Sequence, residues 1–350
     1  MKRYGNLYEK IYDIDNIFLA LNNARKGKSD YREVKQVDRN HEFYAYKIHK
    51  LLKKKLFNNS KYKVFTKKDS GKIRTIYKLP YFPDRIIHHC IMQIVEPIWT
   101  KTFISNTFAC IKGRGIHKGV EKLKEALRNK EETKYCLKCD VKKFYPSVDH
   151  DVLKQIIRKK IKDPDLLWLL DEIIESAPGI PIGNYLSQHF GNLYLSEIDH
   201  VMKEEDKCKY YFRYCDDIVI LHRSKKYLHK IKDQLIKYLI EIRLNLKGNW
   251  QVFPVDSRSI DFLGYRFYHS YTLLRKGTAI NFKRRMIHVK KHYFEMEPIS
   301  VISTVMSQYG WLKHANCLNL TRECIDYDIQ NIVRKICLQN KIHNPLLLTI

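Results

Sequence analysis

Acidic residues are scarce in this sequence, and no long apolar run occurs. The 38 aspartates and glutamates stand against 65 lysines and arginines, which leaves a formal net charge of +27. No apolar stretch reaches the ~18–20 residues that span a bilayer, and no amino-terminal signal pattern is present. These absences argue against a membrane protein, and the excess of positive charge predicts a polyanionic partner.

Paired cysteines with the spacing of zinc ligands are absent too. Nine cysteines occur at irregular intervals, and Cys136 and Cys139 form a CxxC pair that no second pair completes. Their segment reads as a buried strand, on which residues three apart face opposite sides, so we expect a packing role. An odd cysteine count without a secretory signal favours a reduced cytoplasm.

Linkers, low-complexity tracts and internal repeats are missing, whereas apolar residues make up 44% of the 350-residue chain. A folded enzyme with two or three lobes around one cleft is therefore expected. Strand-like and helical patterns alternate, which predicts an α+β fold with helices on one face of a sheet. Strands are predicted at about 62–79 (a hairpin), 136–141 and on both sides of 214–217; helices are predicted at about 85–99, 117–129, 150–161, 165–176 and 184–205, with short basic helices before 60 and after 282.

Two adjacent acids, Asp216 and Asp217, lie between apolar runs that read as strands. A tight turn would hold both carboxylates at one point, where they repel each other unless a cation is present. A third acid, Asp140, ends another apolar strand. Acids from separate strand ends suit a two-metal phosphoryl-transfer site, because Mg²⁺ prefers carboxylate oxygens and substrate phosphates. The alternatives are a solvated bend for the pair and a helix cap for Asp140.

Several motifs, taken in order, resemble those of reverse transcriptases. They are Asp140 followed by Tyr145, Gly183 within Ile182–Gln188, Tyr214-Cys215-Asp216-Asp217, and Phe262-Leu263-Gly264-Tyr265. The resemblance covers roughly residues 70–270. It implies a right-hand polymerase fold, with fingers and the start of the palm at 1–135, a palm with an antiparallel sheet at 136–270, and a helical thumb at 271–350.

Among reverse transcriptases, the chain most resembles those of diversity-generating retroelements. Ile182-Gly183 followed by Ser187-Gln188 stands where most mobile-intron and retron enzymes have Gln-Gly and Ser-Pro. The segments 84–89 and 273–276 are similar to that family as well. The resemblance implies cDNA synthesis on a template RNA, through an RNA/cDNA hybrid and from deoxynucleoside triphosphates, with errors concentrated at adenines. It also implies a basic accessory variability protein as a partner.

The same resemblance implies a role for each site residue. Asp140, Asp216 and Asp217 are expected to be catalytic and, with the Val141 carbonyl, to hold two Mg²⁺ ions, for which Mn²⁺ can substitute. Further roles are implied for Lys72 and Arg74 (triphosphate), Tyr145 (a ring beneath the sugar that excludes a 2′-hydroxyl), Ile182, Gly183 and Gln188 (the nascent base pair), Lys247 (protonation of the leaving pyrophosphate), and Phe262, Leu263, Gly264 and Tyr265 (primer grip).

Simpler interpretations stand beside these roles. The basic strand with Lys72 and Arg74 can be merely solvated, Tyr145 can be a core aromatic, and the 262–265 segment can be a buried turn. Ile182 replaces a polar glutamine near the nascent pair, which predicts a loss in base discrimination of ~1–3 kcal/mol, or roughly one to two decades in error rate.

Two further functions remain as alternatives. One is a retron-type or phage-defence reverse transcriptase; a mobile-intron enzyme is expected less, because 350 residues leave no room for its usual appended modules. The other is a noncatalytic RNA-binding scaffold with the polymerase fold. The resemblance also implies that the basic carboxy-terminal helices follow the phosphates and minor groove of the RNA/cDNA hybrid.

Overall fold

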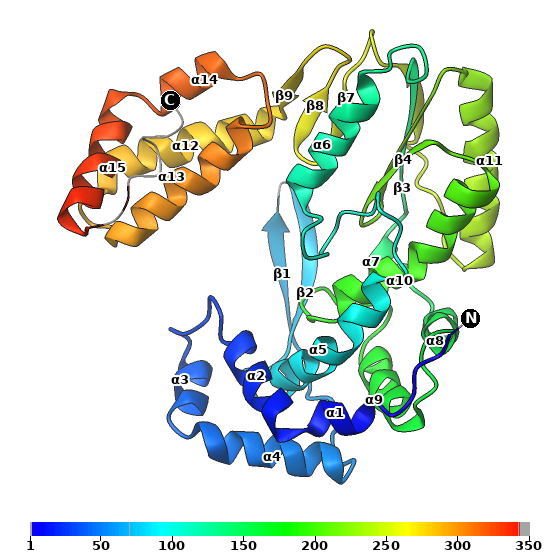
Figure 1. Cartoon of the computed structure of the whole chain (residues 1–350), viewed down its shortest axis with the longest axis vertical. Coiled ribbons are helices and arrows are strands. Elements are labelled where there is room, and N and C mark those ends of the chain that lie inside the picture. Colours follow the sequence, from blue (N-terminus) through cyan, green and yellow to red (C-terminus); the bar gives the residue numbers. More distant parts are fainter. Residues whose placement is uncertain (1, 70, 342, 344–350) are drawn as a thin grey trace. The chain divides into compact units, whose positions relative to one another are not determined.

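The computed structural model describes residues 2–69, 71–341 and 343. The chain forms two compact units, and neither is continuous in sequence (Figure 1). Unit 1 comprises Met1–Lys112, Cys139–Ile218 and Lys230–Trp250, and unit 2 comprises Gly113–Lys138, Val219–His229 and Gln251–Ile350. Among the described residues, no helix is both long and apolar enough to cross a membrane.

Unit 1 begins with short helices, as the sequence predicted, and these helices share one apolar core. Asp13 caps the second helix by accepting hydrogen bonds from the N–H groups of Asp15 and Asn16. Behind this cap, Ile17 and Leu21 are buried where the second helix packs on the fifth. These elements are α1 (Tyr8–Tyr12), α2 (Ile14–Ala24), α3 (Arg32–Asp38), α4 (His41–Lys53), the short helical segment η1 (Tyr81–Arg85) and α5 (Ile86–Thr100).

The predicted hairpin at 62–79 is confirmed. It consists of β1 (Lys63–Asp69) and β2 (Lys72–Lys78), which pair antiparallel with Thr66 opposite Thr75. The Tyr77 N–H donates to the Ile182 carbonyl oxygen at 2.8 Å. This bond ties the base of the hairpin to a loop far along the chain.

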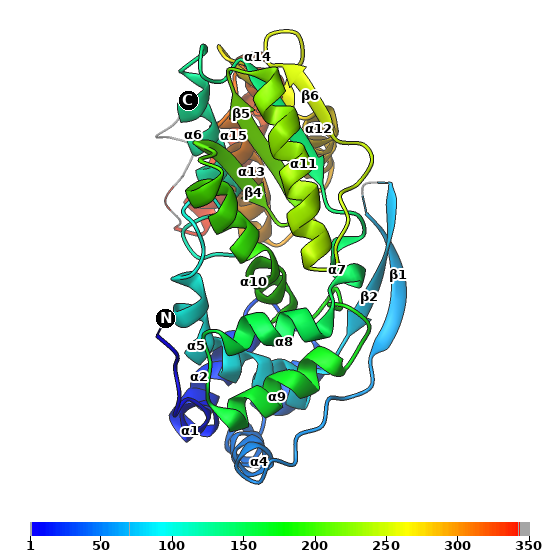
Figure 2. The same ribbon diagram turned by 90° about the vertical axis from the view of Figure 1, so that its right-hand side faces the viewer.

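A four-stranded sheet has the order β4-β5-β3-β6, and its edge pair β3 and β6 is antiparallel with Leu137 opposite Val252. Cys136 and Cys139 are both buried on β3, as a packing role requires. Figure 2 shows two of the accompanying helices, α8 and α9, side by side. The elements are β3 (Tyr135–Asp140), β4 (Tyr210–Tyr214), β5 (Asp217–His222), β6 (Gln251–Pro254), α7 (Phe144–Ser147), α8 (His150–Arg158), α9 (Pro164–Glu175), α10 (Ser187–His200), the π-helical segment η2 (Val201–Glu205) and α11 (Lys225–Glu241).

The helix predicted at 184–205 differs from the structure at both ends. It begins only at Ser187, because the preceding residues are held by β2 and the Ser187 hydroxyl donates to the Pro181 carbonyl oxygen at 2.7 Å. Its last turn, from Val201, is the π-helical segment η2. The prediction of a long helix here is therefore right in type and wrong in its limits.

Unit 2 contains a three-stranded antiparallel sheet with the order β7-β8-β9 and a group of helices that pack on one another. Phe282, Val289, Val305 and Val333 form part of the apolar core between these helices. The elements are α6 (Ile116–Leu127), β7 (Ile260–Phe262), β8 (Tyr265–Phe267), β9 (Thr272–Leu274), α12 (Lys276–His292), α13 (Pro298–Leu312), α14 (Leu318–Cys324) and α15 (Tyr327–Gln339). The basic helices predicted beyond 282 are thus confirmed.

Candidate active site

Two strand ends bring acids together in unit 1. Asp140 is the last residue of β3, and Asp216 lies in the turn between β4 and β5. The Val141 N–H donates to the Asp216 carbonyl oxygen at 3.3 Å, and the two carboxyl groups lie in hydrogen-bonding contact. Asp217 follows as the first residue of β5. The predicted convergence of Asp140 with the Asp216 turn is therefore seen in the structure.

Burial and the neighbouring acids oppose ionisation of Asp216. The pKa of Asp216 rises from 3.8 to about 7, first because the group is buried, then because of its contact with Asp140 and the charge of Asp217. Carboxylates so close favour a shared proton or a cation between them. The donor set therefore fits a divalent cation.

The acids do not form a complete cage. Within the part of the chain that the structure describes, no three histidine, cysteine, aspartate or glutamate side chains are gathered closely enough to hold a metal alone. Mg²⁺ commonly takes only one or two protein carboxylates and completes its shell with water and substrate phosphates. The Val141 carbonyl, next in the chain to Asp140, stays a predicted ligand.

Mg²⁺ binding at this pair should weaken as the pH falls, because a proton competes with the cation for Asp216. With the pKa of Asp216 at about 7, the carboxyl is largely protonated at lower pH and ionised at higher pH. We expect the apparent dissociation constant for Mg²⁺ to rise roughly tenfold from pH 8 to pH 6. Calorimetric titration at each pH measures it, and a constant that does not change with pH would contradict the assignment.

Lys247 lies beside the acids. Its N–H donates to the Asp140 carbonyl oxygen at 2.8 Å, and its Nζ lies 3.5 Å from Asp140 Oδ2. The Lys142 N–H donates to the Asn245 carbonyl oxygen at 2.8 Å, which fixes the segment around Lys247 against the end of β3. The ammonium group offsets part of the negative charge. Its role as a proton donor stays a prediction.

Tyr145 occupies the short helix α7 next to the acid turn. Its hydroxyl contacts the Cys215 thiol, and burial, followed by the nearby Cys215, Cys110 and Asp216, raises the pKa of Tyr145. The phenol therefore stays neutral. Its ring is half-buried, unlike that of its fully packed neighbour Phe144. The predicted contact with a sugar stays a prediction beside the core-aromatic alternative.

The structure explains why position 183 is a glycine, which the sequence did not reveal. Its φ is +127°, and a Cβ atom there would lie 2.4 Å from the Tyr77 carbonyl oxygen of β2. Only glycine tolerates both the conformation and the approach. Ile182 is half-buried and Gln188 is exposed at the start of α10. Roles for these three residues at a base pair stay predictions.

The hairpin residues predicted to bind a triphosphate lie on β2. The backbone of Lys72 belongs to this strand, whereas its side chain lies outside the described residues. Arg74 is exposed and stands opposite Lys67. The strand is thus basic and accessible, which both the triphosphate role and a merely solvated strand would require.

The predicted primer grip is a tight turn between β7 and β8 in unit 2. Phe262 and Tyr265 are fully buried, and the Tyr265 hydroxyl donates to the Trp311 carbonyl oxygen at 3.0 Å. A Cβ atom on Gly264, whose φ is +85°, would lie 2.8 Å from the Trp311 ring. The side chains therefore match the buried-turn alternative, so a grip on a primer would use the backbone of the turn. Sequence reasoning did not identify Trp311.

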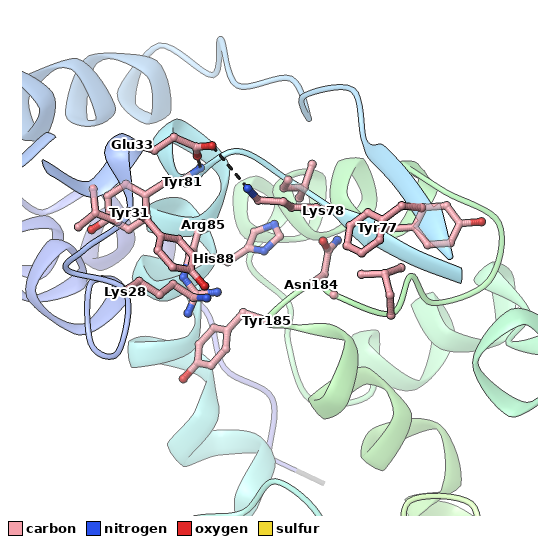
Figure 3. Close-up of a pocket in the computed structure, with 15 residues that line it drawn as sticks. Lys28, Tyr31, Glu33, Tyr77, Lys78, Tyr81, Arg85, His88, Asn184 and Tyr185 are labelled. Carbon is pink, nitrogen blue, oxygen red and sulfur yellow. Dashed lines mark hydrogen bonds and ion pairs between the residues drawn. The ribbon is translucent and has the colours of Figure 1, made fainter. Parts of the chain in front are cut away.

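A cavity of about 430 Å³ opens beside Gly183, between β2, α5 and the loop before α10 (Figure 3). At its wall, Glu33 Oε1 lies 3.6 Å from Lys78 Nζ, and Glu33 Oε2 accepts a hydrogen bond from the Tyr81 N–H at 2.8 Å. Aromatic rings with cations suit a nucleobase and its phosphate. The lysine, arginine, tyrosine and phenylalanine residues that line it are Lys28, Lys78, Arg85, Tyr31, Phe65, Tyr77, Tyr81 and Tyr185.

Known proteins share much of this sequence pattern. The family described as "Reverse transcriptase (RNA-dependent DNA polymerase)" matches residues 65–267, which is more than half of the chain. The retron Ec73 reverse transcriptase of Escherichia coli is 29% identical over 55% of this chain and 63% of its own length. Protein YkfC of Escherichia coli is 25% identical over 41% of this chain and 40% of its own length. The group II intron-encoded protein LtrA of Lactococcus lactis is 26% identical over 38% and 23%, respectively. The chain thus spans less than two thirds of each of these relatives.

Solved structures share the fold. Apo telomerase from Candida tropicalis matches with a TM-score of 0.52 at 13% identity, over 81% of this chain and 59% of that chain. Telomerase from Candida albicans, solved with a fragment of telomeric RNA, matches with a TM-score of 0.50 at 13% identity. This match covers 83% of this chain and 62% of the telomerase chain. At such low identity, these matches show similarity of fold alone. The structural similarity confirms the predicted mixed fold of the right-hand polymerase type.

Proposed function

The chain belongs to the reverse transcriptase family, and we propose that it synthesises DNA on an RNA template by two-metal nucleotidyl transfer. The observation that carries this proposal is the contact between Asp140 and Asp216 at the ends of two strands, with the pKa of Asp216 raised to about 7. Divalent cations would remove the repulsion between two carboxylates held this close.

Several of the predicted site residues have a part in the proposed reaction. Asp140 and Asp216, with Asp217 and the Val141 carbonyl, would hold two Mg²⁺ ions, which neutralise charge on the attacking oxygen and the phosphates when bound. Lys72 and Arg74 would hold the triphosphate. Lys247, 3.5 Å from Asp140, would give a proton to the leaving pyrophosphate.

Extension of a DNA primer on an RNA template tests this function. Purified protein with deoxynucleoside triphosphates and Mg²⁺ should yield cDNA, and chelation of the metal should stop synthesis. RNA binding without any incorporation in Mg²⁺ or Mn²⁺ would favour the noncatalytic scaffold instead.

Tyr145→Val should admit ribonucleotides. The smaller side chain leaves room for a 2′-hydroxyl that the ring would exclude, so discrimination against ribonucleotides should fall by about ten- to a hundredfold. Single-nucleotide incorporation with paired ribo- and deoxynucleotides measures the ratio of kcat/KM. Tyr145→Phe is the matched control, because it keeps the ring. Equal discrimination in wild type and Tyr145→Val would remove Tyr145 from the nucleotide site.

We further propose that copying is error-prone at template adenines, as in diversity-generating retroelements. Ile182-Gly183 with Ser187-Gln188 supports this variant, while the similarity to a retron reverse transcriptase favours a retron-type enzyme as the second candidate. Sequencing the cDNA decides between them: errors concentrated at adenines favour the first, and faithful copying of adenines favours the second. A basic accessory protein that stimulates synthesis would also favour the first.

Ile182→Gln should make copying more faithful. A polar side chain near the nascent pair restores hydrogen bonds that can distinguish right from wrong bases, so misincorporation should fall by roughly tenfold. Error rates per template base, from deep sequencing of cDNA, provide the measurement. Ile182→Leu, which stays apolar, is the control and should keep the wild-type error rate. An unchanged rate in Ile182→Gln would place the source of error elsewhere.

The remaining assignments follow from the same family. We propose fingers and the start of the palm at residues 1–135, a palm at 136–270 and a thumb at 271–350. Exposed basic residues of α12, such as Arg284 and Arg285, would contact the phosphates of the hybrid. The cavity with Tyr31 and Tyr185 would lie on the path of the template, where its rings can stack on bases.

A further inference from the structure

A fully buried ion pair in unit 1 has no part in the roles described above. The side chains of Arg213 and Asp199 are both 0% exposed. Arg213 Nε donates to Asp199 Oδ1 at 2.7 Å and Nη2 donates to Oδ2 at 2.6 Å. Burying two charges is costly, and a well-packed apolar pair is often as stable. A function that apolar side chains could not supply would account for the pair.

Neighbouring groups hold the pair in one orientation. Asp199 also accepts hydrogen bonds from the Tyr211 hydroxyl at 2.7 Å and from Thr107 Oγ1 at 3.0 Å. Arg213 Nη1 donates to Asn192 Oδ1 at 3.3 Å and Nη2 to the Asn192 carbonyl oxygen at 3.4 Å. A charged network whose members are all hydrogen-bonded is rigid. The guanidinium is thus fixed from several sides.

One remaining bond leads from this network to the acid turn. Arg213 Nη1 donates to the Cys215 carbonyl oxygen at 2.9 Å. Cys215 has a φ of +53°, a left-handed conformation that is unfavourable for a residue with a side chain and persists only when its surroundings hold it. That carbonyl belongs to the peptide that joins Cys215 to Asp216. The network therefore fixes the peptide immediately before the acid.

The other side of the turn is held as well. The Val141 N–H donates to the Asp216 carbonyl oxygen at 3.3 Å, so the peptides before and after Asp216 each have a fixed partner. One partner comes from the end of β3, next to Asp140, and the other from the buried network. The direction of the Asp216 side chain toward Asp140 follows from both.

We propose that Arg213, oriented by Asp199, is a positioning residue that fixes the left-handed Cys215 turn and aims the Asp216 carboxylate at Asp140. Its consequence for turnover rests on the proposed polymerase function. Its consequence for the turn can be measured in the metal-free protein. The two can therefore fail separately.

The double variant Arg213→Met/Asp199→Leu tests this by replacing both charges with apolar side chains of similar size. In the metal-free protein, amide hydrogen exchange at Asp216 and Asp217 should accelerate about tenfold or more, while amides of Ile218–Leu221 stay protected. Mn²⁺ affinity should fall about tenfold. In the polymerase assay, kcat should fall about thirtyfold with little change in KM for the nucleotide.

A second ion pair of unit 1 provides the matched control. Arg158 and Asp171 join α8 to α9, with Arg158 Nη1 3.2 Å from Asp171 Oδ1. The variant Arg158→Met/Asp171→Leu also removes one positive and one negative charge, and it should leave exchange at Asp216 and Mn²⁺ affinity at wild-type values. An equal effect in both double variants would show a general loss of stability and overturn the positioning role.

Tyr211→Phe carries the test if the double variant does not fold. It removes only one of the two hydroxyl groups that donate to Asp199, and we expect exchange at Asp216 to rise about threefold. Slow exchange at Asp216 and wild-type Mn²⁺ affinity in a folded variant would overturn the proposal. If the wild-type protein incorporates no nucleotide, the proposed function fails, whereas the exchange and Mn²⁺ measurements still decide the role of Arg213.

Discussion

Asp216→Asn should abolish DNA synthesis, with a loss of about a thousandfold or more, and should make the metal-free protein more stable at alkaline pH. The Asp216 carboxylate, which the cations would bind, is also the group whose ionised form is unfavourable in the fold. Its pKa is raised to about 7 by burial and by Asp140. The neutral amide keeps the shape of the side chain and removes the repulsion.

The effect on stability has a definite sign. The pKa of Asp216 is higher in the folded protein, at about 7, than its ordinary value of 3.8. The folded state therefore binds more protons between these values, and the free energy of unfolding falls as the pH rises through this window. Above it, Asp216→Asn should be more stable than wild type by about 1–3 kcal/mol. Near pH 4 the two should be equally stable.

Urea unfolding of metal-free protein at pH 8 and pH 4, together with primer extension, measures both effects. Asp233→Asn is the matched control, because Asp233 is an exposed acid of α11, and it should change neither activity nor stability appreciably. Full synthesis by Asp216→Asn would refute the site. Lower stability than wild type at pH 8 would refute the electrostatic account.

Gly183→Ala should cost about 2–4 kcal/mol of stability, which is large for the addition of one methyl group. The methyl carbon would lie 2.4 Å from the Tyr77 carbonyl oxygen, and the φ of +127° is unfavourable for alanine. Neither strain can be relieved by a side-chain rotation, because the atom opposite is backbone. We expect β2 to move away and the nucleotide KM to rise with the loss of stability.

Chemical unfolding and steady-state kinetics of the same preparation provide the measurements. Gly248→Ala is the control, since a Cβ atom there meets nothing within 4 Å, and it should change stability by less than about 1 kcal/mol. If Gly183→Ala costs no more than Gly248→Ala, the close approach of the two backbones is wrong.

Local patterns were sufficient to predict the strands that carry the acids. Apolar runs ending in Asp140 and flanking Asp216 predicted buried strands with acids at their ends, and the structure brings these two residues into contact. The order of the motifs then predicted the family that the comparison shows. Both predictions depend on short segments whose burial and turns are encoded locally.

Contacts between distant segments could not be predicted in this way. No local pattern indicated that Gly183 would meet Tyr77, or that the turn at Gly264 would pack on Trp311. The start of α10 was predicted too early for the same reason, because a tertiary contact holds the residues before it. Such contacts depend on how elements pack, which one segment of sequence does not specify.

The division into lobes differs from the grouping by compactness. Fingers, palm and thumb were predicted as three consecutive segments, whereas each compact unit collects three separated stretches of chain. A lobe is defined by what it does to the nucleic acid, and compactness by contacts within the protein. The lobe assignment therefore stays a prediction, and nucleic-acid footprints on the protein would test it.

The absence of a side chain at Gly183 has a mechanical consequence. With one backbone resting directly on another and a hydrogen bond from Tyr77 to Ile182 beside it, the hairpin and the loop have no compressible layer between them. Displacement of one is transmitted to the other. A small molecule bound in the Tyr31 and Tyr185 cavity, which borders both segments, would therefore shift the hairpin and with it the strand that carries Lys72 and Arg74.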